Sequence, residues 1–232
     1  MPSSSGRAAR VSPCDVRSSP TRLTLPDDEA NLLSRALALR GRPVGAAGTR
    51  RKGKVGELVE RALGATGGSA ATWDFPDLRV ELKTIPVDAR TGAPTESTFV
   101  CAVSLADADR AEWATSWVRA KLSRVLWVPL ETRSGERLQR VGTARLWSPT
   151  PEQQQVLAGD FDEIMGRIGA GDVEAVTARL GRWLQLRPKA AHGRVRTLVA
   201  AADGEMVATV PRGFYLRARF TGEILRDPAA MP

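Results

Sequence analysis

The sequence is poor in the side chains that hold transition metals and form disulfides. Its 232 residues include two cysteines, Cys14 and Cys101, and one histidine, His192. Two cysteines cannot build a thiolate zinc site or a disulfide framework, and one histidine leaves no cluster for a metal or a histidine-dependent hydrolase. Zinc fingers, zinc proteases and dithiol redox chemistry are therefore excluded. Any catalysis falls to carboxylates, lysines, arginines, hydroxyls and the single tyrosine, Tyr215.

Long hydrophobic runs are also missing. No stretch approaches the roughly 18 consecutive apolar residues that span a bilayer, and the start of the chain lacks the apolar core of a secretion signal. We therefore expect a soluble protein with no membrane partner. The first residues are mainly Ser, Pro and Arg, which cannot bury enough apolar surface to fold. The prediction is a disordered basic tail over residues 1–25, followed by a single domain over residues 26–228.

Positive charge is in excess and is concentrated. The formal net charge is +8. Residues 40–54 hold six cations and no acid, and residues 182–219 hold eight cations and two acids. Such a distribution is typical of a surface that binds phosphates, so nucleic acid is one expected partner. From charge alone, a solvated basic face that binds nothing remains an equal alternative.

Lysine is rare among these cations. Only five of the 34 are lysines, and all the others are arginines. Because arginine supplies charge equally well, a lysine that remains is a candidate for proton transfer or for a compact point charge. The five are Lys52, Lys54, Lys83, Lys121 and Lys189.

The hydrophobic pattern alternates between helical and strand periods, without internal repeats. This predicts an α/β or α+β domain. The run RVLWVPL at 124–130 is continuously apolar after Arg124, so it is expected to be a central strand. Helices are predicted at 28–40, 53–63, 112–122, around 161–168, at 173–180 and at the C-terminus through Leu225, and strands at 78–85, 97–105, 124–130, 183–187 and 206–210.

One constellation of residues carries metal chemistry. Asp74, Glu81 and Lys83 form the pattern D-x6-E-x-K, and period-2 alternation places Glu81 and Lys83 on the same side of a strand. Two carboxylates that converge with a phosphate oxygen can hold Mg²⁺, and the ammonium group can orient or deprotonate water. The alternative is an ordinary surface ion pair worth about 0–1 kcal/mol. Glu60, at the edge of the apolar stripe of helix 53–63, is either exposed or turned into a cleft.

Longer blocks carry a family resemblance. The segment KGKVGELVERALGATGGSAATWDFPDLRVELKTIPVD (52–88) resembles the MutH family of mismatch-repair endonucleases and its restriction-enzyme relatives. The blocks STFVCAVSL, WATSWVRAKLSRVLWVPL, LWSP, LQLRPKAA and VPRGFYLRARF are similar to the same family and occur in the same order. The resemblance runs from about residue 28 to 226. It implies a restriction-endonuclease fold, a mixed sheet flanked by helices and split into two lobes around a DNA-binding cleft.

The resemblance also implies roles for individual residues. The family's metal-binding and catalytic set is matched by Asp74, Glu81, Lys83 and the helix carboxylate Glu60, with Mg²⁺ as the cofactor. The DNA-binding residues that it implies are Lys52, Lys121, Arg187, Pro188, Lys189 and Tyr215.

Three of these residues are implied to read bases. Arg187, Pro188 and Lys189 match the loop that reads GATC in the major groove, where arginine and lysine commonly contact guanine O6 and N7. Tyr215 matches the tyrosine that senses adenine methylation. His192 departs from the family, which carries an amide at this place, so strict GATC specificity stays open.

The implied activity is Mg²⁺-dependent nicking of the unmethylated strand at hemimethylated GATC sites in double-stranded DNA, during mismatch repair. The resemblance implies MutL as the activating partner, with MutS upstream, and a bacterial cytoplasmic location. A single catalytic block favours a monomer. A GATC restriction endonuclease of the same family and a catalytically silent DNA-binding module are the alternatives.

Overall fold

The structure is a computed structural model that describes residues 25–46, 53–66, 72–133, 135–136, 138–189 and 194–227. Lys52, His192 and all of the predicted tail except Leu25 lie outside these ranges. The α-helices are α1 (Glu29–Ala38), α2 (Lys54–Leu63), α3 (Trp117–Leu122), α4 (Pro151–Gly169) and α5 (Ala218–Arg226). The strands are β1 (Pro43–Ala46), β2 (Glu81–Asp88), β3 (Thr98–Ala102), β4 (Val125–Thr132), β5 (Leu138–Val141), β6 (Arg145–Trp147), β7 (Leu184–Pro188), β8 (Thr197–Ala200), β9 (Met206–Thr209) and β10 (Arg212–Leu216).

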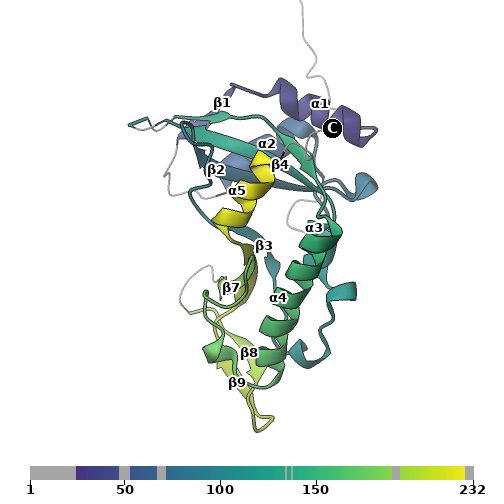
Figure 1. The fold of residues 1–232 in the computed structure, drawn as a ribbon, viewed down its shortest axis with the longest axis vertical. Coiled ribbons are helices and arrows are strands. Elements are labelled where there is room, and N and C mark those ends of the chain that lie inside the picture. Colours follow the sequence, from purple (N-terminus) through teal and green to yellow (C-terminus); the bar gives the residue numbers. More distant parts are fainter. Residues whose placement is uncertain are drawn as a thin grey trace, which may run out of the picture.

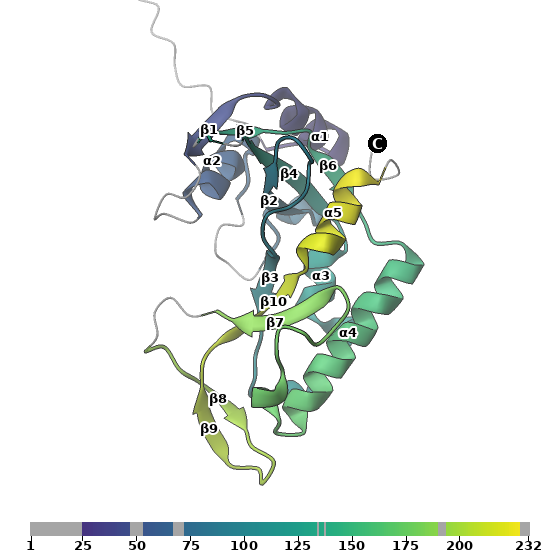
Figure 2. The same ribbon diagram turned by 60° about the vertical axis from the view of Figure 1, so that its left-hand side comes forward.

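The fold is a mixed α/β arrangement in two lobes (Figure 1). The upper lobe holds the larger sheet, in the order β1, β5, β4, β2, with β6 also paired to β4. Among the strands of the described residues, only β2 and β4 pair in parallel, in a register that sets Glu81 opposite Val125. The lower lobe holds the antiparallel sheet β3, β10, β7 and the hairpin of β8 and β9. Figure 2 shows α4 along the lower sheet and α5 returning from β10 toward the upper lobe. The predicted mixed sheet, flanking helices and two lobes are confirmed.

The central position of β4 follows from its sequence. Its alternate residues face two different cores, with Leu126 and Val128 on the side of α1 and α2, and Val125 and Trp127 on the other side. Both faces of the strand are buried from Val125 to Leu130, and the sequence accordingly has no polar residue over that stretch. The prediction of a central strand at 124–130 is confirmed.

Helix α2 begins and ends where the sequence predicts. Its apolar stripe buries Val59 and Leu63. Gly64 follows as a left-handed cap with φ of 82°, a conformation that glycine adopts without strain. One face of the helix therefore packs against the core of the upper lobe, and the adjoining face, with Gly56 and Glu60, faces the space between the lobes.

Two predicted helices are wrong in part. The helix predicted at 112–122 is split, because the Ser116 hydroxyl oxygen accepts a hydrogen bond from the Arg119 amide and starts α3 at Trp117. Only a 3₁₀ turn, Trp113–Thr115, precedes it. The helix predicted at 173–180 is a single 3₁₀ turn, Val173–Ala175. The predicted strand at 78–85 begins at Glu81, because another 3₁₀ turn, Pro76–Leu78, occupies its start.

Candidate active site

A tight turn places Asp74 beside the start of β2. Phe75 and Val80 form an isolated antiparallel bridge around the turn, and Arg79 adopts the left-handed conformation with φ of 54° that closes it. The chain therefore folds back on itself, and the Leu82 amide donates to Oδ2 of Asp74 at 2.8 Å. The spacing of six residues between Asp74 and Glu81 is the length of this turn. Asp74 is 7% exposed and Glu81 is 2% exposed.

Glu81 is held by two lysines. Oε1 accepts from Lys83 Nζ at 2.7 Å, and Oε2 accepts from Lys121 Nζ, also at 2.7 Å. Lys83 lies two residues along β2, on the same face, as the sequence predicts. Its ammonium group also reaches the carbonyl of Val100 on β3, at 3.5 Å. We call Asp74, Glu81, Lys83 and Lys121 the acid–lysine cluster.

Lys121 lies inside this cluster. It comes from the last turn of α3, and its ammonium group also donates to the Thr72 carbonyl at 2.8 Å. The side chain is 11% exposed, and Nζ lies 5.5 Å from the centre of the Trp117 ring. Both Trp117 and Glu81 therefore help to stabilise its charge. The predicted contact of Lys121 with DNA remains untested, and its hydrogen bonds favour a role in holding Glu81.

Burial and mutual repulsion set the electrostatics of the acids. Burial, with a smaller contribution from the neighbouring charge of Glu81, raises the pKa of Asp74 from 3.8 to about 6, although the Leu82 hydrogen bond and the two lysines oppose the rise. Burial also raises the pKa of Glu60, and Glu57 adds to that effect. Both acids are destabilised as anions, and a cation placed between them and a phosphate would relieve this.

A cleft of about 620 Å³ separates the two lobes next to the cluster. Its upper wall comes from α2 and β2 and includes Glu60 and Lys83. Glu60 is therefore turned into the cleft, one of the two possibilities that its place in the sequence left open. The lower wall comes from β3, β7 and β10 and includes all four described residues that the family resemblance assigns to base recognition or methylation sensing: Arg187, Pro188, Lys189 and Tyr215.

Aromatic rings support the two cations of the lower wall. The Arg187 guanidinium lies 5.5 Å from the Tyr215 ring centre, and Lys189 Nζ lies 4.2 Å from the Phe99 ring centre. The two rings meet edge to face, with centroids 5.3 Å apart. Phe99 is a site residue that the sequence reasoning missed. Its period-2 position in the predicted strand 97–105 was the available signal, and nothing local distinguished it from a core phenylalanine.

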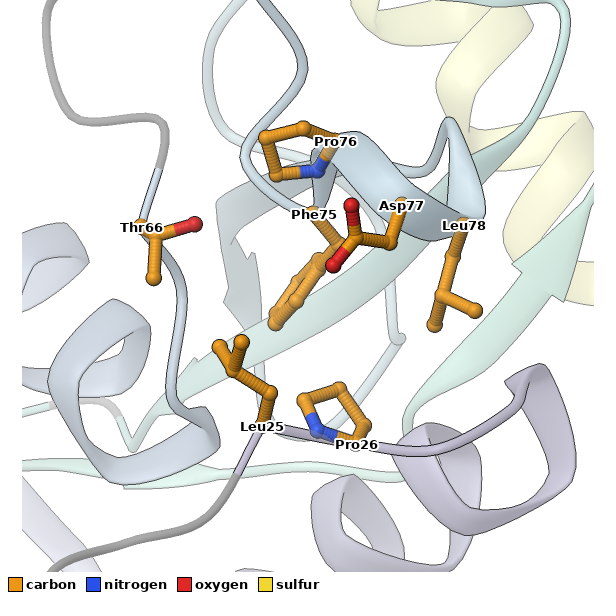
Figure 3. A pocket seen from close by; sticks show the side chains of 7 residues that line it. All are labelled: Leu25, Pro26, Thr66, Phe75, Pro76, Asp77 and Leu78. Carbon is orange, nitrogen blue, oxygen red and sulfur yellow. The ribbon is translucent and has the colours of Figure 1, made fainter.

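A smaller hollow lies elsewhere in the upper lobe. Figure 3 shows Leu25, Phe75 and Leu78 pointing into it, with Asp77 at its side. Its volume of about 10 Å³ holds no more than one water molecule. The cleft between the lobes is therefore the better candidate for a polymer substrate.

Asp74 and Glu81 fit the needs of a magnesium ion. Mg²⁺ is usually bound through one or two carboxylates, with water and substrate phosphate completing its shell. Within the ranges that the structure describes, no three His, Cys, Asp or Glu side chains are grouped for metal binding. Glu60 thus lines the cleft without completing a three-acid cluster with Asp74 and Glu81. Oxygen ligands beyond these two carboxylates would have to come from substrate, water or main chain.

Comparison with known proteins identifies close relatives. A family model described as "DNA mismatch repair enzyme MutH" matches residues 63–160. The DNA mismatch repair protein MutH of Serratia proteamaculans is 45% identical over 216 residues, which cover 86% of this chain and 93% of the relative. MutH of Shewanella amazonensis is 50% identical over 192 residues, covering 81% and 84%. MutH of Histophilus somni is 45% identical over 223 residues, covering 89% and 98%.

Proposed function

The chain belongs to the MutH family of DNA mismatch repair proteins, and from this we propose that it is a Mg²⁺-dependent endonuclease that nicks the unmethylated strand at hemimethylated GATC sites. Membership of the family makes it a DNA mismatch repair protein and a nuclease. The metal, the recognition sequence and the dependence on methylation are the proposed part.

The observation that carries the proposal is the placement of the acid–lysine cluster beside the cleft. Lys83 lines one wall of the cleft, with the buried carboxylates of Asp74 and Glu81 next to it, and the cations Arg187 and Lys189 line the opposite wall. Duplex DNA in this cleft would present a phosphodiester to the acids and base edges to the cations. A DNA-binding module without catalysis would not need two buried acids whose charges repel each other.

Each member of the cluster has a distinct proposed role. Asp74 and Glu81 would hold Mg²⁺, which supplies charge neutralisation at the scissile phosphate and acidifies a water molecule. Lys83 would orient or deprotonate the attacking water, because Lys83 lines the cleft and the hydrogen bond to Glu81 fixes the direction of its ammonium group. Glu60, on the same wall, would support that water or a second metal ion.

Sequence would be read from the lower wall. Arg187 and Lys189 are suited to guanine O6 and N7, and Pro188 stiffens the segment that presents them. Tyr215 is proposed to lie against adenine N6, where a methyl group would clash and remove a hydrogen bond. A discrimination of about 1–3 kcal/mol is expected from such a contact. Lys52 is proposed to contact the DNA backbone near the active site.

The proposal includes the biological setting. The protein would act as a monomer of a single domain, residues 26–228, in the bacterial cytoplasm. It would be activated by MutL, with MutS acting upstream. Among the residues that the structure describes, no helix is long and apolar enough to cross a membrane.

Cleavage of defined duplexes tests the proposal. Purified protein is incubated with Mg²⁺ and unmethylated, hemimethylated or fully methylated GATC duplexes, with and without MutL, and the strands are resolved on a denaturing gel. We expect nicks in the unmethylated strand that increase with MutL. Double-strand cleavage without MutL would instead identify a restriction endonuclease. Absence of cleavage under every condition would identify a silent DNA-binding module.

A further inference from the structure

A buried charge lies directly behind the residues that face DNA in the proposed function. Arg212 begins β10, opposite Pro188 of β7. Side chains alternate along β10, so Tyr215 faces the cleft while Arg212 and Phe214 face the lower core. Arg212 is only 6% exposed, and its Nε has no hydrogen-bond partner. A charged side chain in such a place is expensive to bury and is weak evidence for added stability.

The contacts of Arg212 define a clamp on β10, the strand that pairs with the segment proposed to read bases, residues 187–189, which we call the recognition segment. Nη2 donates to Oε1 of Glu174 at 3.1 Å, and Nη1 donates to the Val176 carbonyl at 3.3 Å. The hydroxyl of Thr209, at the end of β9, donates to the same Glu174 oxygen at 3.1 Å. Glu174 belongs to the 3₁₀ turn after α4. We call Glu174, Thr209 and Arg212 the clamp.

Two residues of the clamp lie on either side of a main-chain contact to the recognition segment. Between Thr209 and Arg212 lies Pro211, whose carbonyl accepts a hydrogen bond of 2.7 Å from the Lys189 amide. Gly213, which follows Arg212, pairs with Arg187. A Cβ atom at Gly213 would lie 2.7 Å from the Phe99 ring, so the ring beneath Lys189 rests directly on this part of β10. A shift of the start of β10 would therefore move both cations and the ring that supports one of them.

We propose that Arg212, through its bonds to Glu174 and Val176, is a positioning residue that sets the sequence specificity of the cleft. The proposal rests on the proposed function. The acid–lysine cluster lies on β2, α3 and the turn before β2, so the chemistry does not depend on the clamp. Loss of the clamp should loosen base recognition while leaving the rate at saturating DNA nearly unchanged. This explains why a buried cation is kept where an apolar side chain would pack.

The test compares Arg212→Met, Arg212→Lys, Glu174→Gln and Thr209→Val with the wild type. Methionine has a similar length and no charge, lysine keeps the charge without the forked bonds, and glutamine keeps an acceptor oxygen. Binding and cleavage are measured on a GATC duplex and on duplexes with one base pair changed. Glu29→Gln is the matched control, since Glu29 pairs with Arg124 far from β10. Melting temperature is measured for every variant.

For Arg212→Met we expect KM on GATC to rise and the ratio of kcat/KM between GATC and altered duplexes to fall about tenfold, with kcat within about threefold of wild type. Arg212→Lys should keep more of this kcat/KM ratio than Arg212→Met does. Glu174→Gln and Thr209→Val should also lower the ratio, by a smaller factor than Arg212→Met. Glu29→Gln should keep it. Should Arg212→Met fail to fold, the Glu174 and Thr209 variants carry the test.

One result would overturn the positioning role alone, and a second would overturn the proposed function together with it. Folded variants that discriminate as well as the wild type, with or without a lower melting temperature, would reduce the clamp to a structural contact. A wild type that shows no preference for GATC would overturn both proposals.

Discussion

The ammonium group of Lys121 lies 2.7 Å from Oε2 of Glu81, and through this contact α3 closes the acid–lysine cluster around β2. The two residues are 40 positions apart in the chain. With Lys83 on the other carboxylate oxygen, Glu81 is fixed in direction before any metal or substrate arrives. Such preorganisation removes a reorganisation step from the reaction.

The first prediction separates two roles for Lys121. Lys121→Met should lower the cleavage rate about 10²-fold, because Glu81 loses one of the two cations that orient it. The affinity for DNA and its dependence on salt should not change. If Lys121 contacted a phosphate, its removal would instead reduce the slope of the logarithm of the DNA-binding constant against the logarithm of the salt concentration by about one.

Binding titrations at several salt concentrations, together with single-turnover cleavage, make this measurement. Lys189→Met is the matched comparison, since Lys189 lines the cleft and is expected to bind DNA. A reduced salt slope in Lys121→Met would return Lys121 to the DNA-binding set predicted from the sequence.

The second prediction concerns the acids and the lysine of the D-x6-E-x-K pattern. Asp74→Ala and Lys83→Ala should each abolish detectable nicking in Mg²⁺ while retaining DNA binding. Asp74 would no longer ligate the metal, and Lys83 would no longer orient water. Asp77→Ala is the control, because Asp77 is an exposed acid three residues from Asp74 that faces the small hollow of Figure 3. Substantial nicking by either active-site variant would refute the assigned roles.

The third prediction concerns the turn that leads into β7. The carboxylate of Asp160 on α4 accepts hydrogen bonds from the amides of Arg182, Trp183 and Leu184, at 2.7–2.8 Å. Asp160→Ala would leave the buried Leu184 amide and two part-buried amides without their acceptor, so we expect a loss of about 3 kcal/mol in unfolding free energy. For a chain of this size that corresponds to about 6–12 °C in melting temperature.

Calorimetry or thermal circular dichroism measures this shift. Asp162→Ala, an exposed acid two positions along α4, is the control and should change the melting temperature by about 2 °C or less. An equal melting temperature for Asp160→Ala and wild type would show that the three amides find other partners.

The sequence predicts a structural feature well when the residues that determine that feature are close together in the chain. The limits of α2 follow from an apolar stripe and Gly64, and the burial of β4 follows from an uninterrupted apolar run. The shared face of Glu81 and Lys83 follows from the strand period. Each of these features is decided within a few residues, so the pattern is sufficient.

Other features depend on contacts between distant segments. Nothing near Lys121 indicates that its partner is Glu81, and nothing near Phe99 indicates that Lys189 lies over its ring. The alternation of residues in strand 78–85 also allows a surface ion pair at Glu81, whereas Glu81 is 2% exposed and bonds to Lys121 of α3. The helix predicted at 112–122 is wrong in its first half because one hydroxyl competes with the helical pattern at Ser116.

The last prediction follows from the raised pKa of Asp74. An acid whose folded pKa, about 6, exceeds its unfolded value of 3.8 binds more protons in the folded state, so its contribution to stability falls as pH rises from about 4 to 6. Above pH 6 the folded protein carries the full penalty of a buried carboxylate beside Glu81. Asp74→Asn removes that penalty and keeps an oxygen that can accept from the Leu82 amide. The inactive variant should therefore be more stable than the wild type, by about 1–3 kcal/mol at pH 8 in the presence of EDTA.

The pH dependence distinguishes this cause from a general gain in packing. The difference in unfolding free energy between Asp74→Asn and wild type should be largest above pH 6 and should shrink toward pH 4, where Asp74 of the wild type is protonated. Asp77→Asn, at an exposed acid three residues along the chain, is measured in parallel as the control substitution. A difference that stayed constant from pH 4 to 8 would contradict the explanation. The buried charge at Asp74 is then stability given up for function, which is expected of a carboxylate placed to receive a metal ion.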